Sequence, residues 1–200
     1  MSKYPVIVFE GIEASGKSTN LNIVSNYLKK KRKRFIKLRE PGGNTFSEKI
    51  RMLLLNKKLK LNKKTDLMLF YASRSENIEK IIRKNYKKKI ILIDRFIDST
   101  IAYQHYGLGV NLSLIKTINK YLLGNIKINF TFLNIVNNNN MVKRLKLRKK
   151  LNRYDKFKHN FYIKVQNGFL NIARKNKKSY KIIDSNKSIE LNKKLIIKNI

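Results

Sequence analysis

Two glycines, a lysine and a serine lie within eight residues near the start of the chain, in the segment Gly11–Ser18. The spacing G-x-x-x-x-G-K-[ST] is typical of a loop whose backbone N–H groups surround phosphate oxygens. The lysine reaches the β- and γ-phosphates, and the serine hydroxyl can coordinate Mg²⁺. The segment therefore predicts a nucleoside triphosphate site. Its predicted residues are Gly11, Ile12, Glu13, Ala14, Ser15, Gly16, Lys17, Ser18 and Thr19.

The segments on both sides of this loop agree with a phosphate site. An apolar segment, Val6–Glu10, precedes it, and Leu21, Val24 and Leu28 share one face of the helix expected after it. That helix would begin near Lys17 and direct its positive N-terminal end at the phosphates. The alternative is a glycine turn with a chance lysine, and it explains neither neighbouring segment.

Five short segments rich in Ile, Val and Phe are typical of buried strands, and longer segments with helical spacing separate them. This alternation predicts an α/β fold: one P-loop domain over residues 1–200, with a mostly parallel five-stranded sheet and helices on both faces. Ligands then bind beyond the carboxyl ends of the strands. The predicted strands are Val6–Glu10, Phe35–Arg39, Ile90–Asp94, Phe130–Val136 and Tyr180–Asp184.

Two further segments have a predicted helical face. The first face contains Leu67, Phe70, Arg74, Ile78 and Ile81, and the second contains Ile163, Phe169, Leu170 and Ala173. The run Asn137–Asn140 is expected to lead into another helix.

Glu10, Arg39 and Asp94 stand at the carboxyl ends of three predicted strands. An acid at such a position near a phosphate loop holds Mg²⁺ directly or through water. Ser18 and Asp94 are therefore the predicted metal site. Asp98 is expected either to orient Arg95 or to contact a sugar.

The composition is strongly basic, with 47 Lys and Arg against 12 Asp and Glu, a formal net charge of +35. A polyanion such as nucleic acid is one interpretation of this charge. The other is a codon bias toward Lys, Asn and Ile, since the lysines are spread over the whole length. Both interpretations predict attraction of anionic ligands.

Several classes of protein are excluded or disfavoured by the sequence. With no cysteine, a disulfide scaffold and a thiol nucleophile are impossible. No signal peptide and no apolar run near the roughly 20 residues of a membrane span are visible, so a cytoplasmic protein is expected. No N-K-x-D element for guanine is present, and helicases and motors usually need a longer chain. A small kinase fits 200 residues best, and it needs an acceptor site.

Three further blocks resemble the thymidylate kinase family. They are Leu38-Arg39-Glu40-Pro41-Gly42-Gly43 directly after the second strand, Leu69-Phe70-Tyr71-Ala72-Ser73-Arg74 on a helix, and the run from Ile93 to Gln104, IDRFIDSTIAYQ. In this order after the phosphate loop their combination is specific, and the resemblance covers residues 6 to about 184. It implies ATP and Mg²⁺ as cofactors and dTMP as the acceptor.

Phe70 and Arg74 are four residues apart, so they share one helix face. The ring can stack on a pyrimidine while the guanidinium donates to a carbonyl oxygen such as thymine O4. The alternative for Phe70 is a core position. Ser99 and Thr100 supply hydroxyls for the base edge. The resemblance places Tyr103 against the sugar, where it would disfavour a 2′-hydroxyl.

The resemblance also assigns the acceptor phosphate. Arg39, Arg51 and Arg95 fall where the family gathers it, although Arg51 has a solvated face as its alternative. Pro41 and Gln104 lie in the same blocks and complete the predicted acceptor site. Glu13 is implied to face the acceptor sugar near its 3′-hydroxyl, the alternative being a solvent-facing position.

Arg144, Arg148 and Arg153 occur where the family carries a mobile lid, here about residues 144–156. No basic residue precedes Lys17 in the phosphate loop, so the resemblance is to the type whose lid supplies the catalytic arginine. Positive charge at the transferring group and exclusion of water are what phosphoryl transfer requires. The alternative is a plain basic surface. Arg144 and Arg148 are expected one helical turn apart.

Together these features predict transfer of the ATP γ-phosphate to dTMP, with Lys17, Arg95 and the lid arginines as catalytic residues. A homodimer is expected from the family, with no membrane and no specific nucleic acid as partner. The alternatives are a kinase for another nucleotide or nucleoside and a nucleic-acid-binding P-loop ATPase. Asn134, where many relatives have Asp, is not expected to affect activity.

Overall fold

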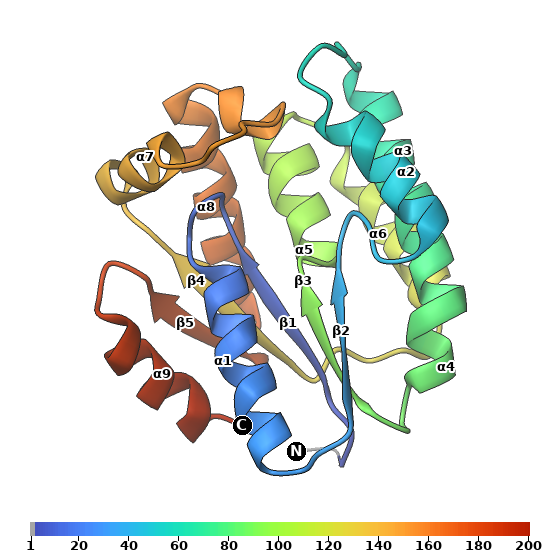
Figure 1. The fold of residues 1–200 in the computed structure, drawn as a ribbon. Helices are drawn as coiled ribbons and strands as arrows, with labels where there is room; N and C mark the ends of the chain where they lie inside the picture. The colour runs from blue at the N-terminus through green and yellow to red at the C-terminus, as the bar shows by residue number, and fades with distance from the viewer. Residues whose placement is uncertain (1–2) are drawn as a thin grey trace.

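A computed structural model describes residues 3–200 of the chain. Its centre is a parallel sheet of five strands in the order β2-β3-β1-β4-β5, visible in Figure 1. The strands are β1 (Val6–Gly11), β2 (Phe35–Arg39), β3 (Ile90–Asp94), β4 (Phe130–Ile135) and β5 (Tyr180–Asp184). The five predicted strands and the predicted α/β class are therefore confirmed.

The central strands are apolar on both faces because helices cover both sides. β1 is buried along its whole length, and β3 is buried except at Asp94. One face packs on α1 (Lys17–Lys30) and α9 (Ile189–Lys198), through residues such as Val24 and Ile196. Figure 1 shows these two helices side by side on the near face of the sheet.

The other face of the sheet carries the longer helices. α8 (His159–Lys175) and the π-helical η2 (Ile101–Gly107) form one cluster there. α3 (Lys63–Asn77) continues into the π-helical η1 (Ile78–Ile82), whose Ile78 and Ile82 are buried beneath β1 and β3. The remaining elements are α2 (Thr45–Leu55), α4 (Arg83–Asn85), α5 (Ile97–Thr100), α6 (Leu112–Leu123), α7 (Asn138–Lys146), η3 (Tyr154–Lys156) and η4 (Lys177–Ser179).

Two predicted helical faces differ in detail from the structure. The face that starts at Leu67 crosses from α3 into η1, where the helical repeat changes, so Ile78 is buried while Ile81 is only partly so. Ile163 is 43% exposed, and the buried face of α8 contains Tyr162, Val165 and Phe169 instead. The Asn run does lead into a helix, because the Asn137 side chain caps α7 by accepting from Asn140 N–H at 2.8 Å.

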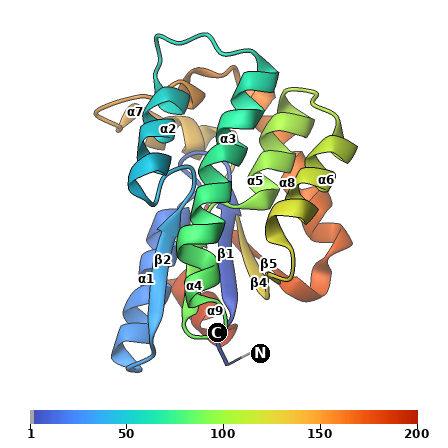
Figure 2. The same cartoon turned by 90° about the vertical axis from the view of Figure 1, so that its right-hand side faces the viewer.

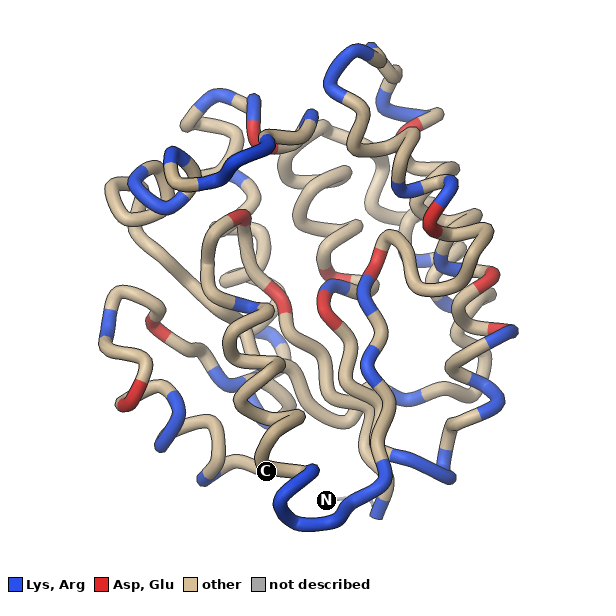
Figure 3. The backbone as a smooth tube through the Cα atoms, viewed as in Figure 1, with Lys and Arg blue, Asp and Glu red and all other residues tan. Residues whose placement is uncertain are grey.

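The carboxyl ends of the strands face an opening between two groups of helices. In Figure 1, α2 and α3 stand on one side of it, and α7 with the segment that follows stands on the other; Figure 2 shows α2 and α3 from the front, with α7 behind α2. Figure 3 shows Lys and Arg over the whole trace, whereas Asp and Glu gather mostly around this opening. No helix within residues 3–200 is long and apolar enough to cross a membrane.

Candidate active site

The phosphate loop lies where predicted, between β1 and α1. Gly16 has φ 81° and stands at the N-cap of α1, a conformation that favours glycine. Lys17 Nζ donates to the Ile12 carbonyl at 2.7 Å, and burial lowers the Lys17 pKa to about 7, with Arg95 adding to the shift. Bound phosphates would instead favour the charged form of this lysine. The side chain of Ile12 is buried in the core, so only its backbone is available to a ligand.

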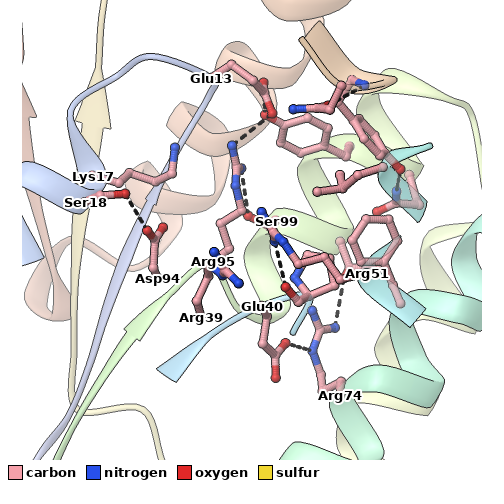
Figure 4. Close-up of a pocket in the computed structure, with 18 of the residues that line it drawn as sticks. Glu13, Lys17, Ser18, Arg39, Glu40, Arg51, Arg74, Asp94, Arg95 and Ser99 are labelled. Atoms are coloured by element: carbon pink, nitrogen blue, oxygen red, sulfur yellow. Dashed lines mark hydrogen bonds and ion pairs between the residues drawn. The ribbon is translucent and has the colours of Figure 1, made fainter. Parts of the chain in front are cut away.

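Ser18, in the first turn of α1, contacts Asp94 at the end of β3. Ser18 Oγ donates to Asp94 Oδ2 at 2.8 Å, an interaction visible in Figure 4. Parallel pairing of β1 with β3 sets Phe9 beside Asp94, which brings the acid to the loop. A hydroxyl and one carboxylate fit Mg²⁺, which keeps several waters and takes further oxygens from phosphates. Among residues 3–200 no group of three or more His, Cys, Asp or Glu side chains forms a separate metal cage.

Arg95 follows β3 in an unusual backbone conformation, with φ 66°. A non-glycine residue there costs of order 1 kcal/mol, so the surroundings must hold it. Glu10, fully buried, accepts from Phe96 N–H at 2.8 Å and from Ser99 N–H at 3.2 Å. Burial raises the Glu10 pKa to about 7, with Asp98 adding to the rise. Glu10 therefore fixes the loop that presents Arg95.

The Arg95 guanidinium lies between the phosphate loop and the Tyr103 ring. It donates to the Gly11 carbonyl at 2.9 Å and to Glu13 Oε1 at 3.0 Å, and it lies over the Tyr103 ring. The Tyr103 hydroxyl donates to the other Glu13 oxygen. Burial alone would lower the Arg95 pKa, but Tyr103 and Glu13 raise it overall. The arginine therefore stays charged, and Glu13 is held by two neighbours rather than facing solvent.

One pocket collects every residue predicted for the acceptor site. Figure 4 shows it beside the phosphate loop, with Arg39, Arg51 and Arg95 around one part and Arg74 deeper, beside Glu40. Phe70 packs against the core cluster that contains Tyr103 and Tyr154, but it is only partly buried and also lines the pocket. The lining residues are Glu13, Lys17, Ser18, Arg39, Glu40, Pro41, Arg51, Leu55, Phe70, Arg74, Asp94, Arg95, Ser99, Thr100, Tyr103, Gln104, Arg148, Asn152 and Tyr154.

Arg74 is held more firmly than helix spacing alone indicates. Its side chain is 2% exposed and donates to Glu40 Oε2 at 2.8 Å, to Thr100 Oγ1 at 2.8 Å and to the Phe96 carbonyl at 3.0 Å. Burial without these partners would be costly for a guanidinium. The remaining N–H groups of its planar fork are available to a ligand. Sequence reasoning missed Glu40 as the partner of Arg74, although it lies in a recognised block.

Arg39 and Arg51 approach the pocket from β2 and α2. Arg39 is exposed and pairs with Glu48 at 3.0 Å, while Arg51 donates to the Pro41 carbonyl at 2.7 Å. Burial lowers the Arg51 pKa to about 10, and the positive charge of Arg39 adds to the lowering. Since Arg51 is half-buried and lines the pocket, its predicted solvated-face alternative does not describe this structure.

A second pocket lies on the other side of the phosphate loop. Arg144 donates to the Ala14 carbonyl at 3.1 Å and to the Ser185 carbonyl at 2.6 Å, so it connects α7 to the loop. Lys17, Ser18 and Arg148 line both pockets. The lining residues of the second pocket are Ala14, Ser15, Gly16, Lys17, Ser18, Thr19, Asn20, Arg144, Arg148, Ser185, Lys187, Ile189 and Asn192.

The predicted lid arginines separate in the structure. α7 ends at Lys146, so Arg148 lies beyond the helix and the predicted one-turn relation to Arg144 is wrong. Arg153 lines neither pocket: it donates to the Leu54 carbonyl at 2.9 Å and pairs with Asp66. The catalytic role predicted for Arg153 stays a prediction, but its guanidinium is bound to α2 and α3 here.

One of the two interpretations of Asp98 is that it orients Arg95, but the structure places its carboxylate against another partner. Asp98 is buried and accepts a hydrogen bond from the Tyr180 hydroxyl, and burial raises its pKa. Asn134 is also buried, where it accepts from Asn20 and donates to the Glu10 carbonyl at 3.2 Å. Asp98 therefore joins α5 to β5, and Asn134 joins β4 to α1 and β1. No motif in the sequence indicated these contacts.

A phosphate loop, an acid on the adjacent strand, and two pockets that share Lys17 and Ser18 define a P-loop nucleotide kinase. The chain belongs to the thymidylate kinase family, because the sequence profile described as "Thymidylate kinase" matches residues 9–196.

Individual relatives agree with this assignment. The chain is 40% identical over 185 residues to a thymidylate kinase of Thermosipho africanus, with 92% of this chain and 91% of that one covered. It is 37% identical over 188 residues to one of Mycoplasma capricolum, at 92% and 88% coverage. The crystal structure of thymidylate kinase from Ehrlichia chaffeensis superposes with TM-score 0.79 and 33% identity, covering 98% of this chain and 97% of that chain.

The raised pKa of Glu10 predicts a pH dependence of stability. Between its ordinary value of 4.5 and about 7, the folded state binds more protons than the unfolded state. The contribution of Glu10 to the free energy of unfolding is therefore fully present at low pH, and it is lost as the pH rises through about 7. We expect wild type to lose about 3 kcal/mol of unfolding free energy relative to Glu10→Gln between pH 4.5 and 8. Urea unfolding at several pH values measures the difference, and a difference that is independent of pH would contradict it.

Proposed function

We propose that this chain transfers the γ-phosphate of ATP to dTMP, giving ADP and dTDP, with the first pocket holding dTMP and the second holding ATP. The observation that carries the proposal is that the two pockets meet at Lys17, Ser18 and Arg148. A donor phosphate on the loop and an acceptor phosphate beside Arg95 would then face each other across this junction. Membership in the thymidylate kinase family supports the choice of substrates.

The acceptor pocket has a different chemistry at each end. Phe70 offers a ring face and Arg74 offers N–H donors, which suits a pyrimidine with carbonyl oxygens. Arg39, Arg51 and Arg95 surround the end toward the phosphate loop, which suits a monophosphate. A thymidine monophosphate has an apolar, hydrogen-bonding base at one end and a dianion at the other, so it matches both.

The sugar would lie between these ends, beside Tyr103 and Glu13. Both are buried and bonded to each other, so the Tyr103 ring is not free to move away from a 2′-hydroxyl. A carboxylate oxygen of Glu13 can accept from a 3′-hydroxyl while Arg95 holds the other side. This arrangement favours deoxyribose over ribose by steric exclusion.

The transfer needs positioning and positive charge rather than a covalent enzyme intermediate. An oxygen of the acceptor phosphate attacks the γ-phosphorus in line, and the bond from that phosphorus to the bridging oxygen of ADP breaks. Lys17 and Arg148 supply charge at the transferring group. Mg²⁺, when bound, neutralises phosphate charge, and Ser18 with Asp94 would hold it. The homodimer and the lid function expected from the family also remain proposals.

A coupled assay that detects ADP tests the proposal across nucleoside monophosphates. We expect dTMP to give the highest kcat/KM, with ribo-TMP and the purine monophosphates much poorer. A purine monophosphate as best substrate would overturn the assignment of the first pocket. ATP hydrolysis stimulated by polynucleotide, without any monophosphate acceptor, would favour the nucleic-acid-binding alternative.

Phe70→Ala tests the base end. Loss of a stacking ring should lower kcat/KM for dTMP, by an amount that corresponds to about 1–3 kcal/mol of activation free energy. The KM for ATP should change little because the second pocket is intact. Tyr121→Ala, which removes an aromatic side chain that is 83% exposed on α6, is the matched control and should behave as wild type. An unfolding midpoint that falls in Phe70→Ala with no change in dTMP kinetics would show that Phe70 is only a packing residue.

Arg148→Ala tests the junction of the two pockets. If its guanidinium acts on the transferring group, kcat should fall by about 10³-fold, the scale of an arginine supplied to a phosphoryl transition state. The neighbouring exposed cation Lys149 lines neither pocket, so Lys149→Ala is the control for lid charge alone. Equal kcat values for the two variants would place the catalytic charge elsewhere.

A further inference from the structure

Asp66 is a buried carboxylate that lies behind the acceptor pocket without lining it. It stands in the first turn of α3 and is 1% exposed. Three side chains donate to it: Gln104 Nε2 at 3.0 Å, the Tyr154 hydroxyl at 2.6 Å, and Arg153 Nη2. Neither the motifs nor the family resemblance pointed to this residue. Both oxygens of the carboxylate accept hydrogen bonds, from partners in two other parts of the chain.

Two of these partners form walls of the acceptor pocket. Gln104 comes from η2 and Tyr154 begins η3, and both line the pocket. The Tyr154 ring packs edge-on against Phe70, with centroids 6.0 Å apart, and against Tyr103 at 5.8 Å. Tyr154 therefore spans the space between the predicted base-facing and sugar-facing rings. Its hydroxyl is held by Asp66, while its backbone carbonyl accepts from the Tyr162 hydroxyl.

The third partner anchors the lid. Arg153 donates to Asp66 and to the Leu54 carbonyl, and the Arg153 N–H donates to the Leu55 carbonyl at 3.1 Å. The ion pair Arg148–Asp155 stays within the lid, whereas Arg153–Asp66 crosses from the lid to α3. A lid that swings away would have to break this pair and withdraw Tyr154 from the pocket in the same movement.

We propose that Asp66 is a positioning residue that latches the lid and completes the acceptor pocket at once. When Arg153 and Tyr154 bind Asp66, the lid is down and the Tyr154 wall is in place; when they leave, both are lost together. A ligand in the acceptor pocket then favours the closed lid because it contacts Tyr154. The choice of dTMP as that ligand rests on the proposed function, but the latch itself does not.

Asp66→Asn is the first test, since it keeps the shape and one acceptor oxygen but removes the charge. Without any nucleotide, trypsin should cut the lid at Lys149 or Lys150 about fivefold faster or more than in wild type, as expected for a contact that restrains local opening. In kinetics, the KM for dTMP should rise about tenfold while kcat at saturating dTMP stays within about threefold, because saturating ligand restores closure. The KM for ATP should change less. Glu79→Gln, which breaks an exposed ion pair with Arg83, is the control and should leave both readouts unchanged.

Arg153 tests the latch from the other side, where the side chain is only partly buried and folding is less at risk. Arg153→Gln should reproduce the faster lid cleavage and the raised dTMP KM of Asp66→Asn, and Arg153→Lys should restore part of the lid protection because the charge remains. The double variant should be no worse than either single variant, since two residues in one contact couple strongly. Effects that multiply in the double variant would overturn the latch.

Three results would contradict the proposal. The first is unchanged lid cleavage and unchanged dTMP KM in folded Asp66→Asn. The second is a lower unfolding midpoint with both readouts unchanged, which would leave Asp66 a purely structural residue. The third is a kcat loss near 10³-fold in Arg153→Gln with an unchanged KM, which would make Arg153 catalytic as the family resemblance implied. If lid cleavage responds but dTMP is not a substrate, the proposed function fails while the latch stands.

Discussion

The site depends on pairing each of its arginines with a fixed acceptor. A phosphate-transfer site needs several cations in one small space, where they repel one another and can fold back onto any nearby oxygen. Here Glu40 holds Arg74, Glu13 holds Arg95, Glu48 holds Arg39, and Asp66 holds Arg153. Arg39, Arg74 and Arg95 line the first pocket, and because each carboxylate takes only part of the guanidinium fork, the other N–H groups of these three arginines remain for a ligand. The pocket is therefore organised before any ligand arrives.

This constraint gives a physical meaning to the distribution of charge. The chain has 12 acidic residues, and Glu10, Glu13, Glu40, Glu48, Asp66, Asp94 and Asp155 all bond groups of the site or the lid. Lys and Arg are spread along the rest of the backbone without a comparable pattern, as Figure 3 shows. Such a distribution is what a composition bias toward lysine would leave if the acids that orient the site cannot be replaced. The net charge of +35 thus needs no polyanion partner to explain it, although it will attract anionic ligands.

Much of this organisation could be predicted from the sequence, because the chemistry lies in short motifs and each strand is apolar enough to recognise. The residues predicted for the acceptor, from Arg39 to Gln104, meet in one pocket because they follow the ends of neighbouring strands or lie on the helices that stand over those ends. What could not be predicted are contacts between distant segments. Asp66 and Arg153 are 87 residues apart, and the end of α7 at Lys146 decides where each lid arginine goes. Neither the spacing of apolar residues nor a motif encodes those positions, because they depend on how the loops pack against the folded core.

Crystal structures of the chain alone and with dTMP would test the central claim of preorganisation most directly. If the pocket is preorganised, the hydrogen bonds of Arg74 to Glu40 and Thr100, and of Arg95 to Glu13 and Gly11, are the same in both states. The base would lie beside Phe70, and the phosphate would take only the N–H groups left free. Arginines that leave their carboxylates and turn into the pocket only when dTMP binds would contradict it, because the carboxylates would then be competitors of the ligand rather than its support.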